Sequence, residues 1–401
     1  MPASQEFAVV VASWFDGERR HAVGPSTFIV RDGRVADIAA GDHSAALRGS
    51  GLAVQHGAFL MPGLVDAHVH LFLDGASTDL TARSAHLKQP LEGLLQAARD
   101  SARQSLACGV TLVRDAGDRH GINHQIRAEA RLPGSAMAQV RSGGMGIKRA
   151  GRYGGFMAQD VQDAPSMREA VRALALDSDE IKLILTGIID FDAGAVTDEP
   201  QFTLEETTEL VASAAECGRK TFAHCSGAKG LAVAAAAGVG SIEHGFFMSA
   251  DILRRMAEKN IAWTPTFSPL HFQWAHPEAL GWSAQTVGNL RRILDQHAEH
   301  LAMATGLGVK LLLGTDAGSM GVAHGHAVVD EIARYLEAGL SLEQTLSAAT
   351  FNARRHFGLA HATLAVGAPF NALLLAQDPW VQLDALRSTL QVWSGALEDA
   401  S

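Results

Sequence analysis

The sequence predicts an α/β fold, a (β/α)₈ TIM barrel with a small β-sandwich-like domain formed from both chain ends. The main observation is a series of eight short apolar runs that alternate with helical segments in the middle of the chain. A second is the length of 401 residues with 47% hydrophobic residues, which suits one large barrel with a modest appendage. The third is a strand-and-turn pattern that covers the N-terminal segment and returns near the C-terminus.

The two chain ends share this pattern of short strands. The segments FAVVVAS and STFIVRDGRVADIAAG alternate in hydrophobicity, and Asp32-Gly33 between them is a hairpin signal. The segment GAPFNALLLAQDP has the same character. We therefore expect residues 1–60 and 362–401 to form one composite β domain, and residues 61–361 to form the barrel.

The barrel segment shows both its strands and its helix boundaries. Gly218 is typical of the residue after a helix end. Capping boxes predict helix starts at Ser166-x-x-Glu169, Thr203-x-x-Glu206 and Ser341-x-x-Gln344. The expected strands are 63–71, 110–116, 136–142, 180–186, 220–225, 239–244, 261–266 and 310–316.

The composition argues against several classes of partner. The formal net charge is −10, from 33 basic and 43 acidic residues, so we expect neither a nucleic acid nor an anionic membrane as partner. No run approaches the ~20 apolar residues of a membrane helix, and the apolar run after Glu6 lacks the preceding basic residue of a signal peptide. Three cysteines make no disulfide framework in a chain of this size. We expect a soluble cytoplasmic protein with a small-molecule substrate, compatible with a homo-oligomer.

Metal-compatible side chains occur where a barrel has its mouth. The active sites of such barrels lie at the carboxyl ends of the strands, so metal-compatible side chains at the ends of the runs are candidates for the active site. Five of the eight runs carry such a residue: His68 and His70 in the first, Lys182 in the fourth, His224 in the fifth, His244 in the sixth and Asp316 in the eighth.

His68 and His70 form an HxH pair in the segment LMPGLVDAHVHLFL. Because side chains alternate along a strand, both histidines share one face, with Asp66 below them. Two neighbouring imidazoles on one face can chelate a borderline-soft cation such as Zn²⁺. Two hydrogen-bonded histidines in a turn would explain the pair taken alone, but the later strand-end residues favour a metal.

Lys182 lies in the segment DEIKLILTG, where burial of an ammonium group is costly. One interpretation is that Lys182 faces outward and pairs with Glu180 or with a helix carboxylate. The other is that the amine is neutral and carries CO₂ as a carbamate, with one oxygen for each of two cations. Two cations about 3.5–4 Å apart would then hold a hydroxide between them.

Taken together, these segments resemble the amidohydrolase superfamily of metal-dependent hydrolases. The resemblance rests on PGLVDAHVHL, the lysine of the fourth run, AHCSG, SIEHG and LLGTDAGSMGVAHGHAVVDEI, in this order. It covers nearly the whole chain, since LEAGLSLEQTLSAATFNARRHFGL is similar to the helical pair that follows the last barrel strand in that superfamily.

The resemblance implies two divalent metal ions, with Zn²⁺ as the expected ion, and a role for Asp316 in proton transfer. Asp316 would take a proton from the bridging water and pass it to the leaving amine. The implied ligands are His68, His70 and Asp316 for one metal, His224 and His244 for the other, and the Lys182 carbamate as the bridge.

Within the superfamily, Lys182 and its run IKLILTG look most like the prolidase and carboxypeptidase branch related to imidazolonepropionase. This likeness implies a hydrolase of EC 3.4 or 3.5 type that cleaves the amide bond of a dipeptide or N-acyl amino acid by attack of a metal-bridging hydroxide. The alternatives are a cyclic amide or lactam hydrolase and a mononuclear deaminase of the same superfamily. The deaminase is disfavoured because HCSGAKG has no acid after His224.

Substrate contacts are expected in the loops after the strands. The glycine-rich segment SGGMGIKRAGRYGGF follows the third run and holds Arg152 and Tyr153. A guanidinium fork suits a substrate carboxylate, although a solvated basic loop would look the same. His271, after the seventh run, is a second candidate, with a surface histidine as the alternative.

Overall fold

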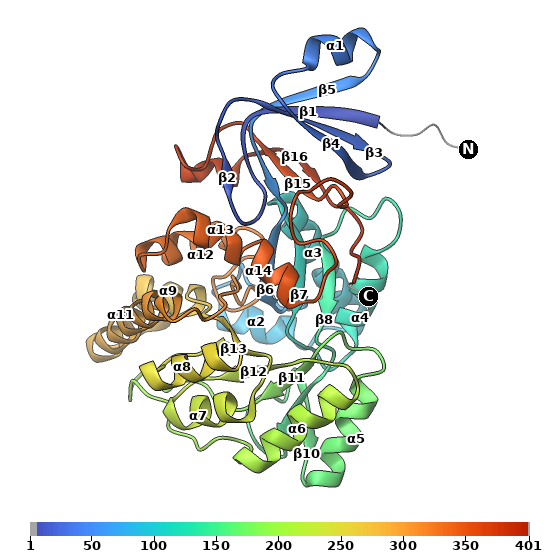
Figure 1. Cartoon of the computed structure of the whole chain (residues 1–401). Coiled ribbons are helices and arrows are strands. Elements are labelled where there is room, and N and C mark those ends of the chain that lie inside the picture. Colours follow the sequence, from blue (N-terminus) through green and yellow to red (C-terminus); the bar gives the residue numbers. More distant parts are fainter. Residues whose placement is uncertain (1–5, 400–401) are drawn as a thin grey trace.

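The computed structural model describes residues 6–399 and places their strands in three sheets (Figure 1). One is a seven-stranded sheet built from both ends of the chain. The others are sheets of six and three strands from the middle of the chain, and all their neighbouring strands run parallel. Parallel strands that alternate with helices confirm the predicted α/β class.

The seven-stranded sheet brings the two chain ends side by side, as Figure 1 shows. In the turn between its third and fourth strands, Asp32 and Gly33 have φ values of 50° and 73°, the left-handed conformation of the predicted two-residue hairpin. The C-terminal strand β15 pairs antiparallel with β5. The strands are β1 (Glu6–Phe15), β2 (Arg20–His21), β3 (Ser26–Arg31), β4 (Arg34–Ala40), β5 (Ala53–Pro62), β15 (Ala372–Leu375) and β16 (Thr389–Trp393), and α1 (Ser44–Gly49) precedes β5.

These strands form one sheet, in the order β16-β15-β5-β1-β3-β4 with β2 beside β1, where a sandwich-like arrangement was expected. The long β1 explains the difference, because it pairs with β2, β3 and β5 and so keeps all strands in one ladder. The division into a composite domain (1–60 and 362–401) and a barrel (61–361) remains our proposal. Residues 1–5 and 400–401 of that domain lie outside the described residues.

The two parallel sheets have the orders β10-β9-β11-β12-β13-β14 and β6-β7-β8. Seven of the eight predicted runs contain a strand of these sheets, whereas β9 lies in the glycine-rich segment that was expected to be a loop and β10 follows that segment. The strands are β6 (Leu64–Val69), β7 (Val110–Asp115), β8 (Gln139–Ser142), β9 (Gly146–Arg149), β10 (Ala158–Val161), β11 (Ile181–Ile184), β12 (Thr221–Cys225), β13 (Ser241–His244) and β14 (Ala262–Thr264).

The eighth predicted run, 310–316, is not a strand but lies between the two parallel sheets. The N–H of Leu312 donates to the carbonyl of Trp263 in β14, and the N–H of Ala67 in β6 donates to the carbonyl of Leu313. Gly314 permits this approach, because a Cβ there would lie 2.9 Å from the backbone nitrogen of His68. The run therefore connects both sheets by a few isolated backbone hydrogen bonds instead of a continuous ladder, and one closed eight-stranded sheet is not observed among the described residues.

Helices pack on the parallel sheets, and two of the three predicted capping boxes are confirmed, at Thr203 and Ser341. The box at Ser166 is wrong: Asp163 caps this helix, and Ser166 is its third residue. Gly218 follows the end of α6, as predicted. The helices are α2 (Leu80–His86), α3 (Leu91–Ala107), α4 (Ile122–Ala130), α5 (Ala164–Leu174), α6 (Leu204–Glu216), α7 (Ala228–Ala237), α8 (Ala250–Glu258), α9 (Ser268–Ala275), α10 (Pro277–Leu280), α11 (Ala284–Gly306), α12 (Ala327–Glu337), α13 (Leu342–Ala348), α14 (Phe351–His356) and the 3₁₀ helix η1 (Leu383–Arg387).

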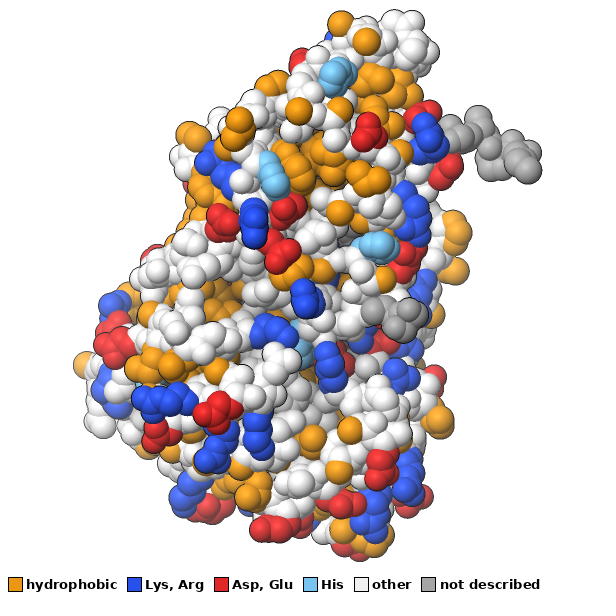
Figure 2. Space-filling model, viewed as in Figure 1, with side chains coloured by type: hydrophobic (Ala, Val, Ile, Leu, Met, Phe, Trp, Pro, Cys, Tyr) orange, Lys and Arg blue, Asp and Glu red, His pale blue; other side chains and the backbone are white. Residues whose placement is uncertain are grey.

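The surface carries charges of both signs. On the face shown in Figure 2, Lys and Arg side chains are interspersed with Asp and Glu side chains, and apolar side chains gather near the seven-stranded sheet. Within residues 6–399, no helix has the length and apolar character needed to cross a bilayer.

Candidate metal centre and active-site cavity

Four histidines and one aspartate from distant parts of the chain lie together at the carboxyl ends of the parallel strands. The imidazole centroids of His68 and His244 are 4.9 Å apart, and those of His224 and His244 are 4.6 Å apart. The Nε2 atoms of His68 and His70 each lie 3.8 Å from Oδ1 of Asp316. The side chains of His68, His70 and Asp316 could hold a metal ion, because their ligand atoms lie within 4.8 Å of one another.

Burial keeps these histidines in the neutral form that binds metals. It lowers the pKa of His70 and of His224 to about 3, and the pKa of His68 and of His244 well below the ordinary value. The nearby Lys182 ammonium lowers all four further. At neutral pH each imidazole therefore keeps a nitrogen lone pair that can bind a cation.

One nitrogen of His68 has a partner and the other has none. Nδ1 of His68 donates to Oε2 of Glu243 at 2.7 Å, which fixes the ring orientation. Nε2 is buried without a hydrogen-bond partner and is directed toward Asp316. Buried polar atoms are seldom left unpaired, and a histidine that donates its other nitrogen to a carboxylate is the usual arrangement of a metal ligand. The donor set thus fits a divalent cation.

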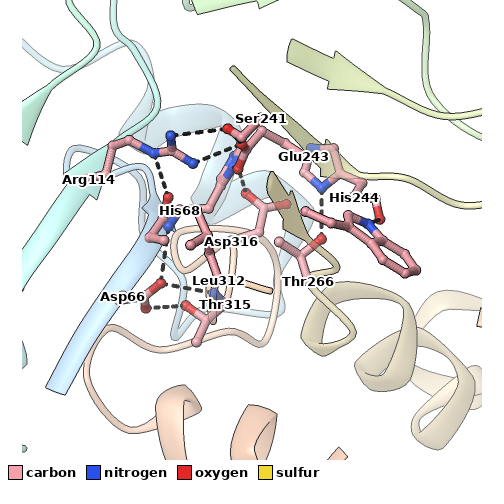
Figure 3. Close-up of polar contacts among 12 residues, drawn as sticks. Asp66, His68, Arg114, Ser241, Glu243, His244, Thr266, Leu312, Thr315 and Asp316 are labelled. Atoms are coloured by element: carbon pink, nitrogen blue, oxygen red, sulfur yellow. Dashed lines mark hydrogen bonds and ion pairs between the residues drawn. The ribbon is translucent and has the colours of Figure 1, made fainter. Parts of the chain in front are cut away.

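Glu243 was not identified from the sequence, although it lies in the quoted segment SIEHG. Its Oε1 accepts from Nη2 of Arg114 at 2.8 Å and from Oγ of Ser241 at 2.5 Å (Figure 3). Nε of Arg114 also donates to the carbonyl of Ala67, so the network connects β6, β7 and β13 beneath the metal ligands. Strict alternation would direct Glu243 and His244 to opposite faces. Because His244 has φ of 66°, the strand is distorted there and both side chains reach the interior.

Left-handed backbone conformations occur at the last residue of three of the predicted runs. Among residues 6–399, six non-glycine residues have positive φ, and His244, Thr266 and Asp316 are three of them. Nδ1 of His244 and Oγ1 of Thr266 are hydrogen-bonded at 2.8 Å (Figure 3). The side chains of two residues with left-handed backbone conformation thus fix each other's position. Strained residues of this kind cluster at functional sites, because only strong surroundings maintain them.

Asp316 is held in place by the neighbouring strand β6. Its N–H donates to the carbonyl of His68 at 2.8 Å, and the adjacent Thr315 donates its N–H and its hydroxyl to the carboxylate of Asp66, at 2.9 and 2.5 Å (Figure 3). Burial raises the pKa of Asp316 to about 7, although a hydrogen bond from Ser319 opposes this shift. Burial thus favours the protonated form of this carboxyl relative to an exposed aspartate.

Lys182 points into the interior and not toward Glu180. The side chain is 1% exposed, and burial lowers its pKa to about 8. Its Nζ lies 4.9 Å from the ring centroid of Phe222, and it has no hydrogen bond or ion pair among the described residues. Glu180 instead pairs with Arg114. A buried amine of lowered pKa is a nucleophile with a substantial neutral fraction, which CO₂ requires.

A cavity of about 230 Å³ opens above these residues. His70, His224, His244 and Asp316 line it, and so does the predicted contact residue Tyr153, whose ring centroid lies 5.4 Å from that of His224.

The other two predicted contact residues do not line this cavity. Nη2 of Arg152 donates to the carbonyl of Glu199 at 2.6 Å, and Nε2 of His271 is hydrogen-bonded to Nη1 of Arg334 at 2.8 Å. Arg152 lies in the turn between β9 and β10, directed toward Glu199, while His271 lies on the face of α9 toward α12. Of the three predicted substrate contacts, Tyr153 lines the cavity and remains a candidate. Arg152 and His271 form hydrogen bonds with other protein groups outside it.

The chain belongs to the amidohydrolase family, whose sequence profile matches residues 59–397. An uncharacterized protein of Mycobacterium tuberculosis is 27% identical over 326 residues, which is 80% of each chain. The ochratoxinase of Aspergillus niger is 25% identical over 324 residues, 73% of this chain and 64% of the enzyme. As a member of this family the chain is a hydrolase, and its family generally uses divalent metal ions.

Solved structures show the same fold. The crystal structure of A. niger ochratoxinase matches with a TM-score of 0.81 at 20% identity, covering 99% of this chain and 96% of that one. A Xaa-Pro dipeptidase with bound methionine also matches with a TM-score of 0.81, at 22% identity and with 99% and 100% coverage. The fold is therefore that of amidohydrolase structures, of the TIM-barrel type.

Proposed function

We propose that this chain is a binuclear metal-dependent hydrolase that cleaves the amide bond of a dipeptide or an N-acyl amino acid. The observation that carries the proposal is the convergence of His70, His224, His244 and Asp316 on one cavity. His68 lies beside Asp316, and the buried Lys182 is close enough to the histidines to shift their pKa values. Relatives named Xaa-Pro dipeptidase and ochratoxinase support amide hydrolysis. A cavity of about 230 Å³ suits a small-molecule substrate.

The residues divide into two ligand groups in this proposal. His68, His70 and Asp316 would hold one divalent cation, and His224 and His244 would hold the other. The amine of Lys182 would add to CO₂ with loss of one proton, and the resulting carbamate would supply two oxygen ligands. When bound, the two cations, for which we propose Zn²⁺, acidify a water molecule and polarise the scissile carbonyl.

The protein side chains orient the ligands and move the proton. Glu243 accepts from Nδ1 of His68 and so fixes which nitrogen faces the cavity. A carboxylate oxygen of Asp316 takes the proton of the attacking water as the new C–O bond forms. Asp316 then donates this proton to the amide nitrogen as the C–N bond breaks, so that an amine and a carboxylic acid leave.

The test is a hydrolysis screen of purified protein prepared with Zn²⁺, Mn²⁺ or Co²⁺. The substrates are a dipeptide series, an N-acyl amino acid series and a set of small lactams, and product amines are quantified. We expect turnover in the dipeptide or N-acyl series that is abolished by chelation and restored by the metal. Asp316→Asn serves as the matched inactive variant. Turnover of lactams alone would favour the cyclic amide hydrolase, and metal-independent turnover would contradict the proposal.

A further inference from the structure

The wall of the active-site cavity, as formed by residues 6–399, is mostly apolar and, apart from the three histidines, carries no basic side chain. Its other polar side chains, besides Asp316, are the uncharged Tyr153, Ser226, Thr266, Gln273 and Ser319. No lysine or arginine occurs among the described residues that line the cavity, and Asp316 is the one carboxylate among them. The apolar wall includes Leu73, Phe156, Ile188, Ile189, Phe191 and Leu270. A group that enters this space leaves water for hydrocarbon surface, which favours an apolar group.

The basic residues of the glycine-rich segment, which contributes Tyr153 and Phe156 to the cavity, form ion pairs and hydrogen bonds with other parts of the protein. Nζ of Lys148 lies 2.5 Å from a carboxylate oxygen of Asp160 and 3.0 Å from the carbonyl of Arg152. Nη2 of Arg149 lies 2.5 Å from the carboxylate of Glu206.

Arg152 completes this set, since Nη2 donates to the carbonyl of Glu199 at 2.6 Å. All three cations of the segment after β8 therefore have partners in the protein. A substrate carboxylate in the cavity would lose its water without gaining a guanidinium or ammonium side chain.

We infer that the enzyme selects its substrate by a large apolar side group and not by a free carboxylate. The inference rests on the proposed function and specifies the substrate of the same site. N-acyl amino acids with aromatic or branched aliphatic side chains fit it, and so do the corresponding amides without a carboxylate. Phe156 and Ile188 are the specificity-determining residues, because both line the cavity and both are partly exposed, 36% and 60%, so a substrate group can cover them.

Four amides separate the two kinds of recognition. They are N-acetylglycine, N-acetylphenylalanine, N-acetyl-2-phenylethylamine and N-(3-phenylpropanoyl)glycine, measured as kcat/KM with the zinc-loaded enzyme. The second and third differ by the carboxylate alone, and the fourth carries the apolar group on the acyl side. We expect kcat/KM for the better of N-acetylphenylalanine and N-(3-phenylpropanoyl)glycine to exceed that for N-acetylglycine by about 100-fold. Loss of the carboxylate should change kcat/KM by less than about tenfold.

The outcomes distinguish this inference from the proposed function. A fall of more than about tenfold on removal of the carboxylate, or equal rates for N-acetylglycine and the benzyl compounds, overturns the inference and leaves amide hydrolysis intact. Hydrolysis of none of the four by enzyme with full metal content overturns the proposed function and this inference with it.

Variants then test the assignment to the wall. Phe156→Ala and Ile188→Ala should each lower the preference for benzyl over hydrogen by about tenfold, because each removes part of the apolar contact. Leu176→Ala is the matched control, since Leu176 is 81% exposed and does not line the cavity. An unchanged preference in both wall variants, or an equal loss in the control, contradicts the assignment.

Discussion

The metal-ligand cluster and the cavity wall lie side by side but are held in different ways. The cluster sits on strand ends that neighbouring backbones fix, for example through the 2.8 Å hydrogen bond from Asp316 to the carbonyl of His68. The wall is made of loop residues such as Phe156 and Ile188, which are partly exposed. We infer from this difference that metal binding depends on the strands, whereas substrate selection depends on loops. Such loops can change in sequence without disturbing the metal ligands.

Removal of the Lys182 amine should have the largest effect. We expect Lys182→Ala to lower kcat/KM by more than about 1000-fold, beyond the ~10–100-fold typical of outer-shell partners, because the bridging ligand is lost. A short carboxylic acid should restore part of the activity. Kinetics and metal content measure both effects, with the exposed Lys229→Ala as control. Full activity of Lys182→Ala would remove the bridge from the account.

The next effect concerns Glu243, which holds the cluster from below. Glu243→Gln removes a charge that pairs with the buried Arg114, so we expect a loss of about 3–5 kcal/mol in the free energy of unfolding. Metal affinity should fall by about 10–100-fold, because His68 loses its orienting carboxylate.

Chemical denaturation and metal titration measure the effects at Glu243. Glu209→Gln, which breaks a half-exposed pair with Arg168, is the control and should cost less than about 1 kcal/mol. Metal affinity unchanged in Glu243→Gln would show that the strand ends alone orient His68.

A smaller effect, on the free energy of unfolding, is expected from Glu331, which connects helix α12 to the helix that carries part of the cavity wall. Glu331 in α12 accepts hydrogen bonds from the N–H groups of Phe267 and Ser268 at the start of α9, which supplies Leu270 to the wall. Burial raises the pKa of Glu331 from 4.5 to about 7. The folded state therefore binds the proton more tightly, and this stabilisation is present below pH 4.5 and lost as the pH rises through 7.

The expected result is a pH-dependent difference between wild type and Glu331→Gln. The free energy of unfolding of wild type minus that of the variant should fall by about 3 kcal/mol between pH 4 and pH 8. Urea denaturation at several pH values measures it, with Glu337→Gln on the same helix as an exposed control. A difference that is flat or rises with pH contradicts the assignment.

The smallest effect, on KM, is expected for Arg152, which lies outside the cavity wall. Arg152→Met should leave KM for carboxylate-bearing substrates within about twofold, since Arg152 donates to Glu199 and does not line the cavity. Steady-state kinetics measure this value beside Tyr153→Phe, a variant in the cavity. A clearly raised KM in Arg152→Met would mean that the loop turns inward when substrate binds.

The sequence predicted the cluster better than the wall for physical reasons. His68 and His70 could be placed because strand alternation is regular and the other candidates recur at strand ends. Glu243 was missed because the left-handed conformation of His244 breaks that alternation.

The segments after the strands follow no such periodicity. The eighth run was expected to be a strand, but Gly314 and the side-chain bonds from Thr315 to Asp66 hold it between the sheets by a few isolated contacts. The glycine-rich segment formed β9, and Arg152 lies in the turn between β9 and β10, where it donates to Glu199 instead of facing the cavity. Tertiary contacts that no local pattern encodes decided both outcomes.

The most direct test of the account is the metal content of the purified protein after expression in zinc-supplemented medium, measured by elemental analysis together with the two variants His68→Ala and His224→Ala. The account predicts about two equivalents of zinc per chain, and the loss of about one in each variant. Absence of bound metal in the wild-type protein, or a single equivalent that persists in His224→Ala, would contradict a binuclear centre at these strand ends.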